Sequence, residues 1–196
     1  MGPKEFYAIR ERLERIRKRD VVSSSMGIIP ASIDFLDHAI REARSDGQKW
    51  HLYLITVGEC VTCRRRDLEM HYRRLRRSEF PDDPFVVTSF AHALAYDEET
   101  RVEALAVAHE AVNAARARGT WIRYSVTWLA RVATMVGDDE ALTEALRQLI
   151  DEGSAWREED YHLVTDFLDQ IAPGRVDPAL LEAYRLLAAS DSDGSA

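Results

Sequence analysis

The sequence predicts an all-α protein, a right-handed stack of antiparallel helical pairs with about nine helices. Apolar residues recur at spacings of three and four along most of the chain, which places them on one face of a helix. Capping residues and glycines separate these stretches. Large aromatic residues open successive segments at intervals of 35, 36 and 35 residues: Trp50, Phe85, Trp121 and Trp156.

The front of the chain contains two apolar stripes at helical spacing. The first consists of Phe6, Ile9, Leu13 and Ile16, and the second of Ile33, Leu36, Ile40 and Ala43. Residues 21–29 between them are rich in serine, so we expect a connector there. Gly47 follows the second stripe and is predicted to end that helix in a left-handed C-cap.

Later helices are marked at their ends. Asp83-Pro84 and Asp177-Pro178 each place a capping carboxylate before a proline at the first helical position. Three glycines follow apolar-periodic stretches, where helices are expected to stop: Gly119, Gly137 and Gly153.

Each interval between the large aromatics holds two helical stretches around a tight link. One helical hairpin cannot cover its own apolar face, whereas stacked neighbours can. The period and pattern resemble the tetratricopeptide (TPR)-like helical repeats, with the best local match at residues 129–149 and a looser one at 91–112. We therefore expect one TPR-like α-solenoid domain over residues 1–189, with a basic helix and connector over 1–29 and a flexible tail over 190–196.

Composition narrows the class of protein. No uncharged run approaches the roughly 18 apolar residues of a membrane span, and the charged N-terminus cannot hold a secretory apolar core. Two cysteines cannot form a disulfide framework, so we expect a soluble protein in the reducing cytoplasm, with no membrane partner.

Charge is unevenly distributed. Residues 1–80 hold 17 basic and 12 acidic residues, whereas residues 81–196 hold 9 basic and 22 acidic ones. The basic half suggests binding to nucleic acid or another polyanion through a patch of six arginines: Arg12, Arg15, Arg19, Arg65, Arg73 and Arg77. Solvated helix faces are the simpler interpretation. A third is a homo-oligomer in which the basic front of one copy meets the acidic back of another.

Cys60-Val-Thr-Cys63 is the shortest motif here with a chemistry of its own. A strand–CxxC–helix interpretation is similar to a thioredoxin-like redox site, but helices follow where that fold needs strands. The repeat period instead places both cysteines on one face of a helix. Zinc would need four ligands, and His51 and His71 are the local candidates. Redox activity and zinc binding stay as weaker alternatives.

Motifs of catalysis are missing from the sequence: it has no glycine-rich phosphate loop, no HExxH pair and no GxSxG elbow. We therefore expect a non-enzymatic protein without cofactor or metal. In a stack of helical pairs the first helix of each pair lines the concave side. Polar residues along those helices predict a groove for a protein or peptide partner, with arginines suited to an acidic group: Tyr53, Thr56, Thr88, His92, Arg123, Thr127 and Arg131. The predicted function is that of an adaptor or interaction module.

Overall fold

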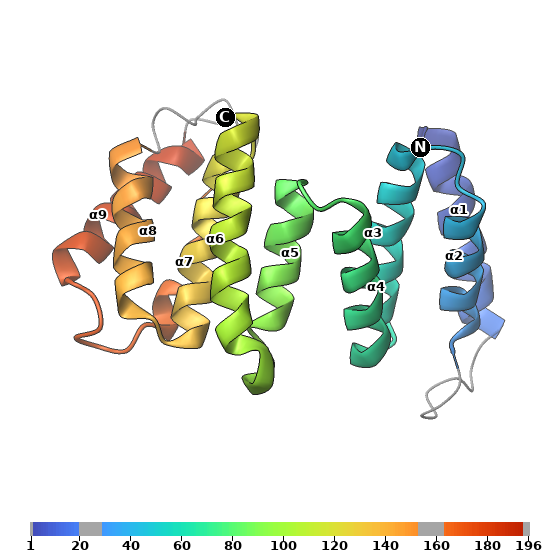
Figure 1. Ribbon diagram of the computed structural model, residues 1–196, viewed down its shortest axis with the longest axis horizontal. Helices are drawn as coiled ribbons and strands as arrows, with labels where there is room; N and C mark the ends of the chain where they lie inside the picture. The colour runs from blue at the N-terminus through green and yellow to red at the C-terminus, as the bar shows by residue number, and fades with distance from the viewer. Residues whose placement is uncertain (1, 20–28, 153–162, 194–196) are drawn as a thin grey trace. The chain divides into compact units, whose positions relative to one another are not determined.

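The computed structural model describes residues 2–19, 29–152 and 163–193 (Figure 1). Within these ranges the chain forms nine α-helices and two short 3₁₀ turns and has no β-strand. The predicted all-α class is confirmed to that extent. The chain divides into two compact units, Met1–Phe80 and Pro81–Ala196.

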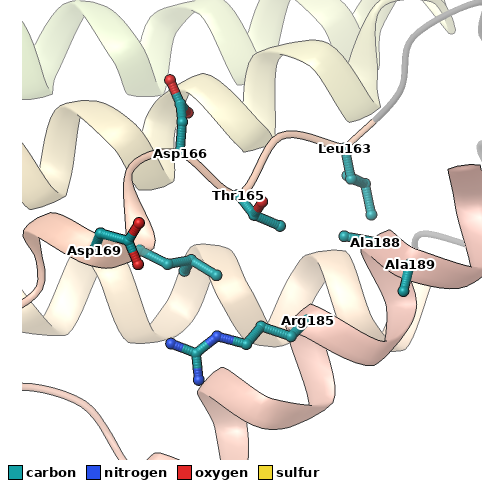
Figure 2. A pocket seen from close by; sticks show the side chains of 8 residues that line it. Leu163, Thr165, Asp166, Asp169, Arg185, Ala188 and Ala189 are labelled. Carbon is teal, nitrogen blue, oxygen red and sulfur yellow. The ribbon is translucent and has the colours of Figure 1, made fainter.

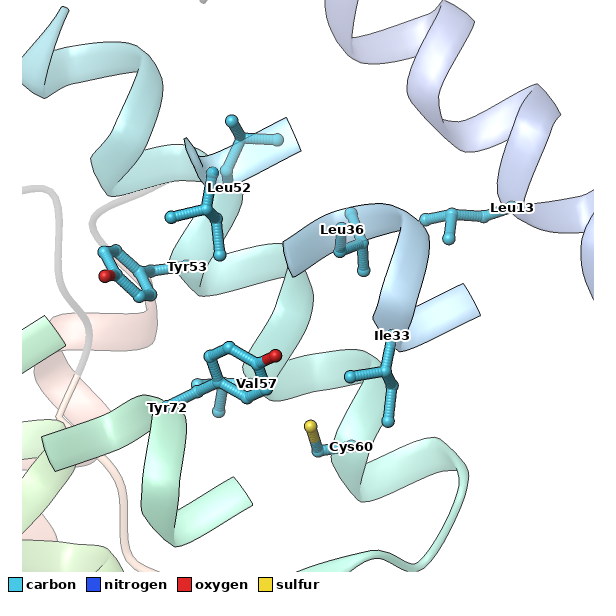
Figure 3. Close-up of a cluster of buried hydrophobic side chains, with 9 residues drawn as sticks. Leu13, Ile33, Leu36, Leu52, Tyr53, Val57, Cys60 and Tyr72 are labelled. Carbon is cyan, nitrogen blue, oxygen red and sulfur yellow. The ribbon is translucent and has the colours of Figure 1, made fainter. Parts of the chain in front are cut away.

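The first unit contains four helices. They are α1 (Pro3–Arg19), α2 (Ala31–Arg41), α3 (Asp46–Thr62) and α4 (Arg66–Glu79). Helix α2 packs against α1 and α3, and α3 packs against α4. Their apolar stripes meet in a core of nine buried residues (Figure 3): Leu13, Ile33, Leu36, Ile40, Leu52, Tyr53, Val57, Cys60 and Tyr72.

A buried carboxylate ties α1 to α3. Glu59 is 2% exposed, and the guanidinium of Arg17 donates hydrogen bonds to both of its carboxylate oxygens. Burial acts to raise the pKa of Glu59, but the hydrogen bonds from Arg17 and Ser32 outweigh it and leave the pKa below its ordinary value. Glu59 is therefore held as a charged, paired group inside the first unit.

Helix α3 begins earlier than the glycine signal predicts. The expectation that Gly47 ends the preceding helix is wrong, because α2 ends at Arg41 and Gly47 lies in the first turn of α3. The hydroxyl of Ser45 accepts a hydrogen bond from the Gln48 backbone N–H, which caps α3 at that residue. A side-chain cap thus sets this boundary, and Gly47 does not adopt the left-handed conformation.

The second unit contains five helices and the two 3₁₀ turns. They are α5 (Pro84–Leu94), η1 (Glu98–Thr100), α6 (Arg101–Arg118), α7 (Ile122–Val136), α8 (Asp139–Glu152), η3 (Leu168–Gln170) and α9 (Pro178–Asp193). Each α-helix packs against the next one along the chain, and α5 also packs against α7. The small side chains of α6 that allow this close approach are fully buried: Ala104, Ala108, Ala111 and Ala115.

Most of the predicted helix ends in this unit are confirmed. The Asp83 and Asp177 carboxylates accept backbone hydrogen bonds at the starts of α5 and α9. Gly119 and Gly137 end α6 and α7 in the left-handed region, with φ of 66° and 84°. Gly153 lies outside the described residues, as do Trp156 and most of the 21–29 connector.

The single domain expected over residues 1–189 stays a prediction. Helix α9 continues to Asp193, so residues 190–193 of the predicted tail are helical in backbone conformation. The last three residues lie outside the described part of the chain.

Candidate functional site

Six rings form a continuous run over α5 and α7 in the second unit. We call this surface the ring face, and it consists of Phe85, His92, Tyr96, Trp121, Tyr124 and Trp128. Phe85 and His92 lie seven residues apart on α5, and Tyr96 follows in the turn after that helix. Tyr124 and Trp128 lie four residues apart on one line of α7, and Trp121 occupies the N-cap position before it. Tyr96 and Trp121, at the two ends of the run, are 58% and 41% exposed.

Ring contacts connect the two helices at both ends. Near the start of the helices, the centroid of Phe85 lies 5.6 Å from that of Trp121 and 5.4 Å from that of Tyr124, with the Phe85 and Tyr124 rings stacked. Further along, His92 lies 4.3 Å from Trp128 and 5.0 Å from Tyr96. Tyr124 joins the two groups, at 5.9 Å from Trp128. Such edge and stacked pairs stabilise one another, so the six rings form one contiguous cluster, in which Tyr124 is buried and the other five are at least partly exposed.

The order of these contacts shows that α5 and α7 run in the same direction. Phe85 and Trp121 stand at the starts of their helices, and His92 and Trp128 meet about two turns later. Beneath the rings the hydroxyls of Thr88 and Ser125 lie 3.3 Å apart, both buried. The ring face therefore rests on a direct α5–α7 contact.

Arg131 extends the run by one turn of α7. Its guanidinium carbon lies 4.8 Å from the Trp128 ring centroid, and its Nη2 lies 2.8 Å from Oδ2 of Asp166. The guanidinium of Arg131 thus contacts an aromatic face and a carboxylate at the same time, which is a favourable arrangement for a cation.

Trp121 has a left-handed backbone conformation, with φ of 63° and ψ of 20°. A residue other than glycine pays about 1–3 kcal/mol for such a conformation. It occupies the N-cap position of α7 without making a side-chain capping hydrogen bond. The turn between α6 and α7 thus retains a strained, half-exposed tryptophan at the end of the ring face.

Five of the seven predicted partner-binding residues are buried. Tyr53 and Thr56 lie in the core of the first unit, where Tyr53 donates to Glu79 and Thr56 to the Leu52 carbonyl. Thr88, Arg123 and Thr127 are buried in the second unit. His92 and Arg131 are partly exposed and lie on or beside the ring face. A ligand carboxylate would have to compete with Asp166 for Arg131.

The sequence prediction includes only His92 among the six rings and misses the other five as candidate site residues: Phe85, Tyr96, Trp121, Tyr124 and Trp128. In that prediction Phe85 and Trp121 only mark the starts of segments. The signal that could have found the surface was the aromatic spacing along α7, read together with the equivalent line on α5.

Several arginines of the predicted basic patch are engaged within the first unit. Arg65 pairs with Asp67 at 2.7 Å and Arg73 with Glu69 at 2.8 Å. Arg12 lies over the Phe35 ring at 4.5 Å, and Arg15 donates to the Glu11 carbonyl. Arg77 is partly buried on α4, and the Arg19 side chain is not described.

The two cysteines lie at the end of α3. Cys60 is fully buried, and Cys63 is partly exposed at the C-cap. Burial raises the pKa of Cys60 to about 12, opposite to the lowering that activates a redox thiol. Among the described residues, no group of three or more histidine, cysteine, aspartate or glutamate side chains is placed to hold a metal ion.

Hollows also lie along the described helices of the second unit. One, of about 350 Å³, lies before and along α9, with Asp166, Asp169 and Arg185 around it (Figure 2). Another, of about 600 Å³, is lined by residues of α6 and α8. There Asp138 caps α8 and Glu144 accepts from Gln148, so these carboxylates serve the helix itself.

No helix in the described ranges is long and apolar enough to cross a membrane. Comparison with protein-family models, curated proteins and solved structures finds no match to this chain in any of the three.

Proposed function

We propose that this protein is a non-enzymatic interaction module that binds a peptide segment of a partner protein on the ring face of its second unit. The observation that carries the proposal is the run of six rings with both ends exposed. Rigid aromatic side chains provide a large contact area at small conformational cost, and they dominate many binding surfaces.

The TPR-like architecture is part of this proposal. It is supported by the sequential packing of α5 to α8, by the α5–α7 contact and by the shared direction of those two helices. In such a stack the first helices of successive pairs share one side, and the ring face would then be the concave one. The proposed binding surface is therefore formed by the rings, and not by the buried threonines of the predicted groove.

The test is selection of peptides from a random displayed library on the full chain, followed by affinity measurements on variants. Tyr96→Ala and Trp121→Gly are expected to weaken the selected peptides about tenfold each. Tyr7→Ala is the matched control, because Tyr7 is 62% exposed on α1 of the first unit. Peptides that bind all variants equally would refute the proposal.

Polyanion binding through the basic first unit is the alternative. Variants in the two units distinguish it from peptide binding on the ring face. Nucleic acid or heparin would be insensitive to Tyr96→Ala and would be released by Arg12→Glu combined with Arg15→Glu. It would also weaken steeply with salt, because phosphate contacts release counterions.

A further inference from the structure

A hollow of about 390 Å³ lies in the first unit, beside α1 and α2. The described residues that line it are two arginines and two apolar residues: Arg12, Arg15, Ile16 and Phe35. Its volume is within the range of about 300–1,000 Å³ that is typical of small-ligand sites. The part of the lining that the structure describes therefore combines positive charge with an apolar wall and contains no carboxylate.

The guanidinium of Arg12 is held in place without being neutralised. Its central carbon lies 4.5 Å from the centroid of the Phe35 ring. A guanidinium that lies over a ring uses its face for that contact and keeps the N–H groups at its edge for hydrogen bonds in its own plane. Phe35 thus orients Arg12 and leaves it able to bind an anion.

Arg15 provides a second positive group at the same hollow. Its Nε lies 3.4 Å from the Glu11 carbonyl oxygen, which makes a long hydrogen bond to a neutral group. Within the described part of the chain, neither Arg15 nor Arg12 forms an ion pair, whereas Arg10 and Arg17 on the same helix pair with carboxylates. Two positive charges without a carboxylate partner therefore lie at one hollow.

The carboxylates that are nearest in the sequence do not line the hollow. Glu11 and Asp34 are immediate chain neighbours of Arg12 and Phe35, but neither is among the lining residues. Consecutive residues of a helix point about 100° apart, so a chain neighbour faces another direction. The hollow therefore presents positive charge to a ligand that enters it.

We infer that this hollow binds a small phosphate monoester that also contains a planar ring. A phosphate monoester carries a charge of about −1.5 to −2 at pH 7, which two guanidiniums match, whereas a carboxylate carries a single charge. Its oxygens accept the paired hydrogen bonds that arginine donates. The ring of the ligand packs against Phe35 and Ile16, which are both partly exposed. The site lies in the first unit and does not depend on the ring face.

The experiment measures the affinity of the full chain for inorganic phosphate, phenyl phosphate and adenosine monophosphate by NMR titration. At least one of the two ring-bearing phosphates is expected to bind about tenfold more tightly than inorganic phosphate, because its ring covers the apolar wall. The tighter of the two indicates the source of the ligand, a phosphorylated tyrosine or a nucleotide. If neither binds more tightly than inorganic phosphate, the inference is wrong.

Two double variants of equal charge test where the phosphates bind. Arg12→Gln with Arg15→Gln removes both positive charges from the hollow and should weaken the tighter probe at least about tenfold. Arg10→Gln with Arg44→Gln removes the same charge from exposed positions of the first unit that do not line the hollow, and it should change the affinity by less than about twofold. All four side chains are exposed, so both variants leave the core intact. Equal losses in the two double variants would overturn the inference.

A polyanion is the other occupant that the experiment distinguishes. Heparin or an oligonucleotide that Arg12→Gln with Arg15→Gln releases, while neither ring-bearing phosphate binds, would overturn the small ligand and favour polyanion binding by the first unit. Tyr96→Ala should leave the affinity for all three phosphates unchanged, since Tyr96 lies in the second unit. The outcome for this hollow is therefore separate from the outcome for the ring face.

Discussion

The guanidinium carbon of Arg131 lies 4.8 Å from the centroid of the Trp128 ring, one turn earlier on α7. Its partner carboxylate, Asp166, comes from the segment before η3. This single side chain therefore connects the ring face to the part of the unit that leads to α9.

Arg131→Ala should destabilise the protein by about 1 kcal/mol, because it removes the cation–π contact with Trp128 and the ion pair with Asp166. Arg185→Ala on α9 is the matched control, since Arg185 and Glu182 form an exposed pair one turn apart. Urea unfolding measures both variants, and equal effects would show that Arg131 does not hold α7 to the segment before η3.

The strain at Trp121 predicts that a glycine variant is more stable than an alanine variant there, which reverses the usual order of stability within a helix. Because φ is positive there, Trp121→Gly should be more stable than Trp121→Ala by about 1 kcal/mol in urea unfolding. At Ala106, an exposed position within α6, glycine should cost about 1 kcal/mol relative to alanine. The same preference at both positions would contradict the left-handed assignment.

Arg17→Ala should destabilise the protein by about 2 kcal/mol, because it leaves the Glu59 carboxylate buried without its guanidinium. Arg10→Ala is the control, since Arg10 and Glu14 form an exposed pair worth less than about 0.5 kcal/mol. Equilibrium unfolding in urea measures both. Equal effects would show that the buried pair does not hold α1 to α3.

The same pair predicts an acid dependence of stability. Since the folded pKa of Glu59 is lowered, its contribution is present above the unfolded value of about 4.3 and is lost as pH falls through the folded value. Unfolding free energies between about pH 3 and pH 6 should therefore drop less steeply in Arg17→Ala than in the wild type. Asp67 contributes with the same sign in both proteins, because hydrogen bonds from Arg65 lower its pKa to about 2.

The thiols should react in two stages. A thiol-reactive disulfide dye near pH 8 is expected to modify the partly exposed Cys63 first and Cys60 only on unfolding, because burial raises the pKa of Cys60 to about 12. Cys63→Ser isolates the slow thiol. Rapid labelling of Cys60 in the native protein would revive the redox interpretation.

The sequence by itself determined the all-α class and most helix boundaries. These depend on local chemistry: Asp83 caps its own helix, and Gly119 adopts a left-handed conformation that its sequence position already indicates. The boundary error at Gly47 is local as well. The Ser45 cap starts a new helix before a glycine stop could act.

Only the tertiary structure decided which side of each helix is covered. Thr88, Arg123 and Thr127 form a polar line in sequence, but all three are buried in the fold. The hydroxyl of Thr88 lies within hydrogen-bond distance of the Ser125 hydroxyl, and that of Thr127 donates to the Arg123 carbonyl. Periodicity defines a stripe along a helix, but it does not say which neighbour covers that stripe. The ring face exists because two helices 37 residues apart lie side by side, a relationship that no local signal contains.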